Sequence, residues 1–431
     1  MWLAVEVFQL AANNTTVRTE LLAGLTTYLT MAYIVVVNPA ILAPSGIDPG
    51  AAFVATCIAA AVGSAAMGLF ANLPLALAPG MGLNAYFTFT LVKGMGVSWQ
   101  VALGVVFLAG VLFLIVSLLH IREWLITAIP LPLKLGIGAG IGLFLGLIGL
   151  QEMGVVVADP ATLVTLGHLG QPRTLLALLG FLVMAALTAR GVRGAILIGI
   201  IVTALLGVPF GLTTFTGVVS APPSLAPVFM KLDIGGALSG GLIAAVLTLF
   251  LVDVLDNAGT LIATTQRAGL MRADGSVPRL REALLADSGG AVLGALIGTS
   301  TTCSYIESAA GIQAGGRTGL TALAVAALFL LTLFFAPIAT AIPAFATAPA
   351  LVIVACLMMR ALADIGWDDA TDYVPAIIIA LAMPFTFSIT TGIGLGFVVY
   401  VVMKLAAGRL AEIPGAAWLI AVLAVLKFAL A

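Results

Sequence analysis

The sequence predicts an all-α polytopic membrane protein, because the chain is very apolar and its apolar residues are gathered in long segments. The 431 residues are 62% hydrophobic and only 8% charged, with a mean hydropathy of +1.23. A soluble domain carries about 25% charged residues, so this chain has too little polar surface to coat a particle in water. A spanning helix needs roughly 20 apolar residues, which leaves room for about 12 to 15 spans.

The apolar segments, bounded by Pro, Gly or charge, form two series of seven. The first series covers residues 21–37, 52–70, 73–95, 100–118, 133–151, 174–189 and 194–211. The second series covers residues 238–262, 284–298, 299–315, 318–341, 345–362, 374–388 and 391–407. Because seven is odd, a second repeat would be inverted relative to the first, as in many secondary transporters. A last apolar stretch, residues 416–431, is compatible with a fifteenth span or with an interfacial helix.

The basic residues predict which ends of the segments face the cytoplasm. With the N-terminus inside, Lys93, Arg173 and Lys231 fall on the outer side of the membrane. The cytoplasmic ends then hold Arg18, Arg122, Arg190, Arg193, Arg267, Arg272, Arg279, Arg281, Arg317, Arg360, Lys404 and Arg409. Cytoplasmic loops of membrane proteins are enriched in Lys and Arg. We therefore expect a multi-pass protein of the cell inner (plasma) membrane with a cytoplasmic N-terminus.

Several classes of protein are disfavoured by what the sequence lacks. The net charge is -1 and no basic run resembles a nucleic-acid surface, so no nucleic-acid partner is expected. Cys57, Cys303 and Cys356 lack CxxC spacing, and His is too scarce for a zinc site. Without a nucleophile elbow or phosphate loop, an enzyme is not expected, and GIGAGIG near Gly136 indicates close helix packing. A channel would need a continuous pore lining, which conductance measurements would reveal.

The third segment of the first series departs from plain helix. Pro74 and Pro79 remove backbone donors, and Gly80 and Gly82 add flexibility just before Asn84. We expect a short extended piece over residues 75–78, followed by a half-helix that begins near Gly82. The N-terminal end of that half-helix would point unpaired N–H groups at the membrane centre.

The third segment of the second series is interrupted in the same place. A run of small hydroxyl residues from Thr299 to Ser304 precedes Tyr305 and Glu307. Ser and Thr compete with helical backbone bonding, so another half-helix is expected to start near Glu307. Pro and Gly often merely kink membrane helices. Two breaks at matched repeat positions, each with a polar side chain, instead favour a binding site between them.

The first segment of the second series carries two carboxylates inside an apolar run. Asp253, Asp256, Asn257 and Thr260 follow helical spacings of three and four, so they share one face. Asp253 would lie roughly 15 Å from the inner end, near the midplane. A carboxylate there costs several kcal/mol unless it is protonated, paired or hydrated. We therefore expect Asp253 to titrate near neutral pH, so that a proton crosses together with a small polar solute.

Three acids are the candidates for proton coupling, namely Asp253, Asp256 and Glu307. The proton is the only coupling ion expected, with no cofactor and no metal. Asp256 is also compatible with a purely structural tie to a neighbouring helix, and Asn84 with an ordinary interhelical hydrogen bond. These residues together predict a transporter.

Four stretches resemble one family closely: TTVRTELLAGLTTYLTMAYIVVVNPAIL, ALAPGMGLNAYFTF, FLVDVLDNAGTLIATTQRAGL and GTSTTCSYIESAAGIQAGGRTGLTA. They are similar to stretches of the AzgA-like purine permeases, the adenine, guanine and hypoxanthine transporters related to the nucleobase/ascorbate transporters. The resemblance runs from about Thr15 to Lys404, nearly the whole chain. The apolar tail after Pro414 fits the family pattern least well.

The resemblance implies fourteen spans in two inverted repeats, with short strands in spans 3 and 10. A core domain, residues 15–118 and 238–342, would move in an elevator-like manner against a gate domain. The gate domain would comprise residues 119–237 and 343–431, and the second range includes the C-terminal tail. A homodimer through the gate domain is also compatible with the sequence. The resemblance also assigns Asn84, Asp253 and Glu307 to substrate binding, and Asp256 to transport.

A purine suits the candidate residues chemically. Carboxylates accept ring N–H groups, and ring nitrogens or carbonyls accept hydrogen bonds from Asn84, Ser304 or the half-helix at Gly82. Tyr28, Phe87 and Tyr305 are candidates to cover the faces of the base. The expected substrate-binding set is Asn84, Gly82, Asp253, Glu307, Ser304, Tyr305 and Tyr28. A pyrimidine base, xanthine or an anion stays an alternative, although an anion would favour a cationic residue at the site.

Overall fold

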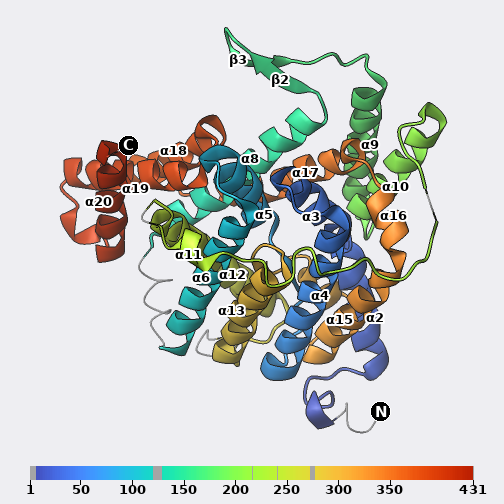
Figure 1. Ribbon diagram of the computed structural model, residues 1–431. Coiled ribbons are helices and arrows are strands. Elements are labelled where there is room, and N and C mark those ends of the chain that lie inside the picture. The colour runs from blue at the N-terminus through green and yellow to red at the C-terminus, as the bar shows by residue number, and fades with distance from the viewer. Residues whose placement is uncertain (1–5, 120–128, 216, 240, 272–276, 431) are drawn as a thin grey trace.

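The protein is built of helices, with two short two-stranded sheets (Figure 1). This computed structural model describes residues 6–119, 129–215, 217–239, 241–271 and 277–430. Within those residues, eight helices are long and apolar enough to cross a membrane, and four shorter apolar helices accompany them. The prediction of a multi-pass helical membrane protein is thereby confirmed. Arg122 and Arg272, which we placed at cytoplasmic ends, lie outside the described residues.

Most helices overlap predicted segments, but the first predicted segment, residues 21–37, is divided between two helices. The first half contains α2 (Val17–Met31), α3 (Ile34–Leu42), η1 (Ala43–Ser45), α4 (Pro49–Ala66), η2 (Met67–Ala71), β1 (Leu77–Pro79), α5 (Met81–Ala85), η3 (Tyr86–Gly94), α6 (Trp99–Leu118), α8 (Leu131–Glu152), β2 (Val156–Asp159), β3 (Leu163–Leu166), α9 (Pro172–Ala189), α10 (Ala195–Gly207) and η4 (Val208–Phe210). The second half contains α11 (Ile234–Ala237), α12 (Ile243–Arg267), α13 (Leu280–Ile297), β4 (Thr302–Ser304), α14 (Ser308–Gln313), α15 (Gly319–Thr332), η5 (Leu333–Phe335), α16 (Ala336–Ala341), α17 (Ala344–Met359), η6 (Arg360–Asp364), α18 (Ala370–Thr386), α19 (Ile389–Ala406), η7 (Leu410–Glu412) and α20 (Gly415–Leu430).

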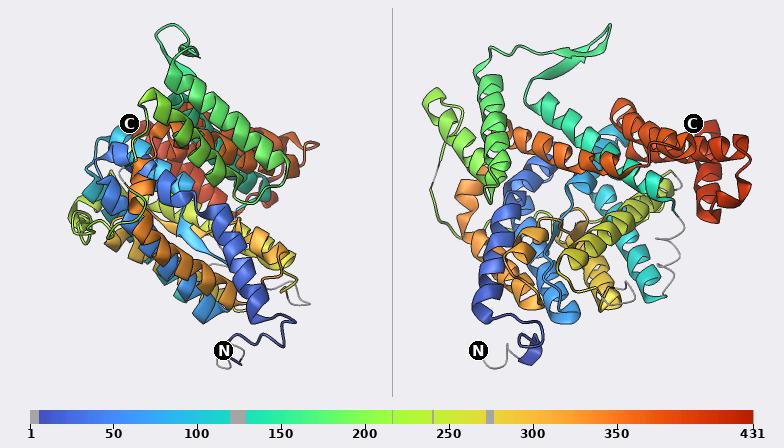
Figure 2. Two further views of the ribbon diagram at one scale, coloured as in Figure 1. Left: turned by 90° about the vertical axis from the view of Figure 1, so that its right-hand side faces the viewer. Right: turned by 180° about the vertical axis from the view of Figure 1, so that it is seen from behind.

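The helices pack in two groups, which Figure 2 shows from two further sides. In the first group, α2 to α6 pack with α11 to α16: α15 lies on α2 and α4, and α13 on α6. In the second group, α8 to α10 pack with α17 to α20: α17 and α18 lie along α8, and α19 on α18. The groups meet where α3, α5 and α12 face α17, α8 and α19, and where α2 meets α10. The hairpin of β2 and β3 projects beyond the helices (Figure 1).

Glycine determines how closely α8 approaches its neighbours. A Cβ atom on Gly136 would lie 2.7 Å from the backbone oxygen of Ala376 in α18. A Cβ atom on Gly142 would lie 2.8 Å from the Cβ atom of Met358 in α17. Small residues allow such close packing of membrane helices. The interpretation of GIGAGIG as a packing motif is therefore confirmed.

A buried carboxylate closes the N-terminal end of α15. Glu20 on α2 is fully buried, and its carboxylate oxygens accept hydrogen bonds from the backbone of Arg317 (2.9 Å) and Thr318 (3.2 Å). Its Oε2 also accepts from the hydroxyl of Thr321 at 2.6 Å. A carboxylate at a helix N-terminus satisfies unpaired N–H groups and interacts well with the helix dipole. Glu20 therefore joins the start of the chain to the second half of the first group.

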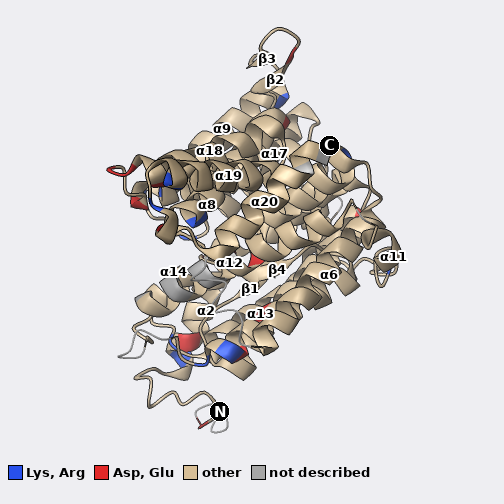
Figure 3. Cartoon of the chain, turned by 90° about the vertical axis from the view of Figure 1, so that its left-hand side faces the viewer, with Lys and Arg blue, Asp and Glu red and all other residues tan. Residues whose placement is uncertain are grey.

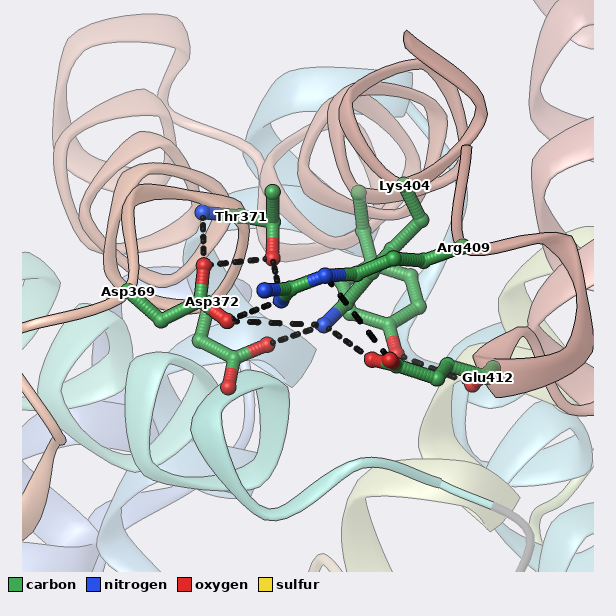
Figure 4. Close-up of polar contacts among 7 residues, drawn as sticks. Asp369, Thr371, Asp372, Lys404, Arg409 and Glu412 are labelled. Atoms are coloured by element: carbon green, nitrogen blue, oxygen red, sulfur yellow. Dashed lines mark hydrogen bonds and ion pairs between the residues drawn. The ribbon is translucent and has the colours of Figure 1, made fainter. Parts of the chain in front are cut away.

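Lys404 of α19 lies at the centre of a charged cluster (Figure 4). Its side chain is only 3% exposed, and Nζ lies 3.0 Å from Asp372 Oδ1 and 2.9 Å from Glu412 Oε2. Arg409 pairs with Asp369, and hydrogen bonds from Thr371 and Arg409 hold the pKa of Asp369 well below its usual range. A buried charge is stable only when it is paired in this way. The cluster joins α18 and α19 to the turn that leads into α20.

Candidate functional site

The two predicted breaks form a short antiparallel pair of strands inside the first group. In the register of β1 and β4, Leu77 lies opposite Ser304 and Pro79 opposite Thr302. The pairing is extended by bonds from the backbone N–H of Tyr305 to Ala76 and of Gly80 to Thr301, both 2.9 Å. Figure 2 shows β1 as an arrow among the helices of the first group. We call this pair of strands the strand crossing.

Side chains of neighbouring helices bond to the backbone of the strand crossing. The hydroxyl of Ser64 on α4 accepts from the N–H of Leu77 at 2.9 Å and donates to its carbonyl at 3.1 Å. The hydroxyl of Thr302 donates to the carbonyl of Gly290 on α13 at 2.8 Å. Non-helical backbone is tolerated at membrane depth only where protein or water satisfies it. These contacts therefore explain how β1 and β4 persist inside a helical protein.

Asn84 lies on α5, directly after β1, and is fully buried. Its Oδ1 accepts a hydrogen bond from the hydroxyl of Ser300, which fixes the orientation of the amide. Among the described residues, its Nδ2 is buried with no hydrogen-bond partner. Leaving a buried donor unpaired costs about 1–3 kcal/mol. The N–H groups of the Asn84 amide are therefore available to a further hydrogen-bond acceptor.

On the other side of the strand crossing, α12 contributes an acid and an amide. Asp253 is 1% exposed, and its Oδ1 accepts from Asn257 Nδ2 at 2.8 Å. The Oδ1 of Asn257 accepts from the backbone N–H of Ser304 at 2.8 Å. The predicted spacing of four residues thus places Asp253 and Asn257 on one helix face. Asp256, nearly one turn further along, has an exposed side chain.

Asp287 on α13 is a further buried acid, which the sequence interpretation missed. It is fully buried, and its Oδ2 accepts from the hydroxyl of Ser304 at 3.1 Å. Ser304 consequently links β4 to acids on two helices, directly to Asp287 and through Asn257 to Asp253. The signal in the sequence was an isolated acid between Ala286 and Ser288 within an apolar segment. Figure 3 shows acidic residues within the body of the molecule near α12 and β4.

Glu307 follows β4 and is held by a tyrosine that we did not predict. Its side chain is half-buried, and Oε1 accepts from the hydroxyl of Tyr33 at 2.6 Å. Tyr33 lies at the break between α2 and α3, where the helix is interrupted. Glu307 is thus positioned from the first half of the chain.

The other two predicted tyrosines have hydroxyl groups engaged by the protein. The hydroxyl of Tyr305 donates to the carbonyl of Pro79 at 2.6 Å, which strengthens the strand crossing. The hydroxyl of Tyr28 lies 2.5 Å from that of Thr332, and its ring packs edge-on against Phe329. Tyr28 therefore belongs to the contact between α2 and α15, whereas Tyr305 lies at the strand crossing.

The second group approaches this site closely at Gly82. A Cβ atom on Gly82 of α5 would lie 2.3 Å from Cγ2 of Ile141 on α8. Nearby, the hydroxyl of Tyr86 on η3 lies 2.9 Å from that of Thr390 on α19. Phe387, between α18 and α19, adopts a φ of 53° and packs edge-on against Phe144 of α8. The site is therefore covered on this side by α8 and by the turn between α18 and α19.

Buried acids and amides at interrupted helices, within a protein of many apolar helices, define a membrane transporter. The chain belongs to the Permease family (Xan_ur_permease), whose model matches residues 18–395. This membership confirms that it is a transporter and not an enzyme.

Three similar proteins cover almost the whole chain. A putative permease of Methanocaldococcus jannaschii is 53% identical, over 98% of this chain and 97% of its own. The adenine permease AdeP of Escherichia coli is 48% identical, over 98% and 95%. The guanine/hypoxanthine permease PbuO of Bacillus subtilis is 45% identical, over 94% and 96%. The predicted membership of the AzgA-like purine permeases is thereby confirmed.

Solved structures of other transporters share the fold. The transmembrane domain of the cyanobacterial bicarbonate transporter BicA has a TM-score of 0.68 at 17% identity, over 86% of this chain and 96% of its own. The murine anion transporter Slc26a9, in its inward-facing state, has a TM-score of 0.66 at 10% identity, over 90% and 68%. At such identities the likeness concerns the fold alone.

Proposed function

We propose that this protein is a secondary active transporter that imports a purine nucleobase, adenine or guanine/hypoxanthine, by proton symport. The observation that carries the proposal is the buried amide of Asn84, oriented by Ser300 with its N–H groups unpaired. Asp253 on α12 and Glu307 after β4 would supply hydrogen-bond acceptors beside the strand crossing. The adenine and guanine/hypoxanthine permeases among the similar proteins support the same class of substrate.

The arrangement fits the edge of a purine. Asn84 would donate to a ring nitrogen or carbonyl of the base, and Glu307 or Asp253 would accept from a ring N–H. The first-turn N–H groups of α5, at Gly82, add donors without a helical acceptor. Ser304 acts mainly by holding Asp287 and Asn257, and Tyr305 by bonding to Pro79. These two residues therefore shape the site, and Tyr305 offers its ring to a face of the base.

We further propose that Asp253, Asp256 and Glu307 share the coupling proton. A site with several carboxylates is costly to move across a membrane in its charged form. Protonation removes one charge, so that the base and the proton cross together. Asp256 has the exposed side chain among the three, which suits proton exchange with water.

For the movement, we propose an elevator-type mechanism on a fold of fourteen spans in two inverted repeats. The first group corresponds to the core domain, residues 15–118 and 238–342, and carries the strand crossing. The second group corresponds to the gate domain, residues 119–237 and 343–431, and would stay in place. Matched breaks at β1 and β4 support the repeat relationship. The few direct contacts between the groups, such as Tyr86 with Thr390, support their relative movement.

For the location, we propose the inner (plasma) membrane with the N-terminus in the cytoplasm, as the distribution of arginines favours. A homodimer through the gate domain would use the apolar surface around α20, where Trp418, Leu419 and Val422 are exposed. In a membrane, such a surface suits either lipid or a second subunit.

Gly82→Ala should reduce uptake about tenfold, because the new methyl group would collide with Ile141 and overpacking costs about 1–3 kcal/mol. The collision penalises only conformations in which α5 lies against α8. Initial uptake rates in cells that express equal amounts of each variant would measure the effect.

Gly138→Ala on α8 is the matched control, since no atom lies within 4 Å of the position that its new methyl group would take. Ile141→Ala combined with Gly82→Ala should restore uptake in part. Normal uptake by Gly82→Ala would show that α5 does not need to approach α8 during transport.

Tyr33→Phe should weaken purine binding about tenfold or more, because a hydrogen bond to a charged group is worth about 1.5–3 kcal/mol. Without this hydroxyl, the carboxylate of Glu307 is no longer held in place by Tyr33. Tyr28→Phe is the matched control, since the same change there removes only the contact with Thr332. If both variants lowered affinity equally, Tyr33 would have no special role in positioning Glu307.

Another small solute, namely a pyrimidine base, xanthine or an anion, is the second candidate. Transporters of bicarbonate and other anions share the fold. Acidic side chains at the strand crossing oppose an anion, because like charges repel in a site of low dielectric constant. A purine therefore agrees better with the residues of this chain.

Uptake of radiolabelled adenine, guanine and hypoxanthine by cells that lack their own purine transporters tests the proposal. We expect at least one purine to accumulate, and accumulation to rise when the outside is made more acidic. Uptake of none of the three would contradict the substrate assignment. Accumulation that is indifferent to the pH gradient would contradict proton symport while leaving the substrate in place.

A further inference from the structure

An apolar hollow lies on the surface of the molecule, where α2 and α3 face α10 and α15. It has a volume of about 370 Å³ and lies between helices that Figure 1 shows along the right-hand edge. We call it the lateral groove. Its lining residues are almost all apolar and include Tyr28, Val36, Leu197, Ile201, Leu331 and Phe335.

The few polar atoms of the lateral groove are satisfied within the protein. The hydroxyl of Tyr28 lies 2.5 Å from that of Thr332, which also donates to the carbonyl of Leu328 at 2.7 Å. The groove consequently offers no free polar group to a solute such as a base. From Tyr28 at the end of α2 to Val36 in α3 it follows eight residue steps across the break between the two helices, about 12 Å at 1.5 Å per residue. Its occupant must be apolar and elongated.

The groove lies at membrane depth, since most of its walls belong to Val17–Ser45 and Gly319–Ala341, which are long and apolar enough to span, and the rest to the shorter apolar helix α10. Its rim is open, because Ile201 is 40% exposed and Leu331 55% exposed. An open apolar hollow at this depth faces the hydrocarbon chains of lipids.

One end of the lateral groove carries positive charge. Arg193 is exposed, and its Nη1 lies 3.5 Å from the hydroxyl of Thr26, two residues before Tyr28. Leu197 and Ile201 follow Arg193 at steps of four residues. Among the described residues, no carboxylate lies within ion-pair distance of Arg193 or of Arg190, both of which lie in the connection between α9 and α10.

We propose that the lateral groove binds an anionic phospholipid, with one acyl chain along α2 and α3 and the phosphate on the guanidinium of Arg193. Two arginines without acidic partners, Arg190 and Arg193, favour an anionic headgroup over a zwitterionic one. The walls come from both helix groups, α2, α3 and α15 on one side and α10 on the other. The lipid is therefore bound across the seam between the groups, and its binding does not depend on which solute is transported.

The test uses the purified full-length protein, delipidated in detergent and titrated with phosphatidylglycerol or with phosphatidylcholine of the same chain length. Thermal stability and the amount of lipid retained after gel filtration report binding. We expect wild-type protein to prefer phosphatidylglycerol and inorganic phosphate alone to have no effect. Arg193→Gln should weaken phosphatidylglycerol binding about fivefold, the factor for one arginine at an anionic surface.

Two further variants separate the headgroup from the chain. Arg193→Lys should retain most of the preference, and Ile201→Trp, which fills the groove, should reduce retention of both lipids. Arg173→Gln is the control, since Arg173 is an exposed arginine at the opposite end of the second group. Equal stabilisation by the two lipids, or unchanged phosphatidylglycerol binding by Arg193→Gln, would overturn the proposal.

Discussion

Replacing Glu307 with Gln should abolish purine binding, with a loss of affinity of at least about 100-fold. The carboxylate is held by the hydroxyl of Tyr33 at 2.6 Å, so the position of one of its oxygens is fixed. A glutamine in the same place would present its N–H groups to the N–H groups of the base. Buried donors without acceptors weaken binding strongly. Equilibrium binding of a radiolabelled purine to the purified variant would measure the loss.

The control for this change is Glu282→Gln, because Glu282 is an exposed glutamate in the first turn of α13. Gel filtration should show both variants as folded protein. Wild-type affinity in Glu307→Gln would exclude Glu307 from the binding site and would leave Asp253 as the candidate acid there.

Asp253→Asn should weaken uptake and flatten its dependence on external pH. In the wild type, uptake should rise as the external pH falls, because the site crosses the membrane more readily with a proton bound. An asparagine is permanently neutral, so acidification of the outside should increase uptake less than in the wild type. Its Oδ1 is still able to accept from Asn257, so the contact with the strand crossing is retained. Uptake measured over a range of external pH would reveal the change.

For comparison, Asp368→Asn removes an exposed acid before α18 and should leave the pH profile of uptake unchanged. A profile for Asp253→Asn with the same shape as the wild type would assign the proton to another acid. Asp256→Asn and Glu307→Gln would then be compared in the same way.

The apolar helices and the two breaks were predictable from the sequence because they depend on local properties. Apolar length determines where helices cross the bilayer, and α4 and α6 begin and end within a few residues of the predicted segments. Pro79 and the hydroxyl run before Ser304 prevent regular helix, so extended structure was expected at both places. The strand register was not predictable, because it joins segments more than 220 residues apart.

The partners of buried polar residues were the hardest to predict. Tyr28 and Tyr33 lie in the same apolar stretch, and only the break between α2 and α3 directs Tyr33 toward Glu307. Asp287 and Glu20 lie near the ends of predicted segments, and each is buried and hydrogen-bonded to a distant part of the chain. Lys404, expected at a cytoplasmic end, is buried among acids of α18 and η7. Such pairings depend on tertiary packing, which local patterns do not encode.

Competition binding to the purified protein tests most directly whether the strand crossing is a purine site. Radiolabelled adenine or guanine would be bound at equilibrium and challenged with other purines, with uracil, and with sulfate or bicarbonate. We expect displacement by purines alone, together with loss of binding when Asn84 is replaced by Leu, which has a similar size but no amide. Displacement by sulfate or bicarbonate, or undiminished purine binding by Asn84→Leu, would contradict a purine site built from Asn84, Asp253 and Glu307.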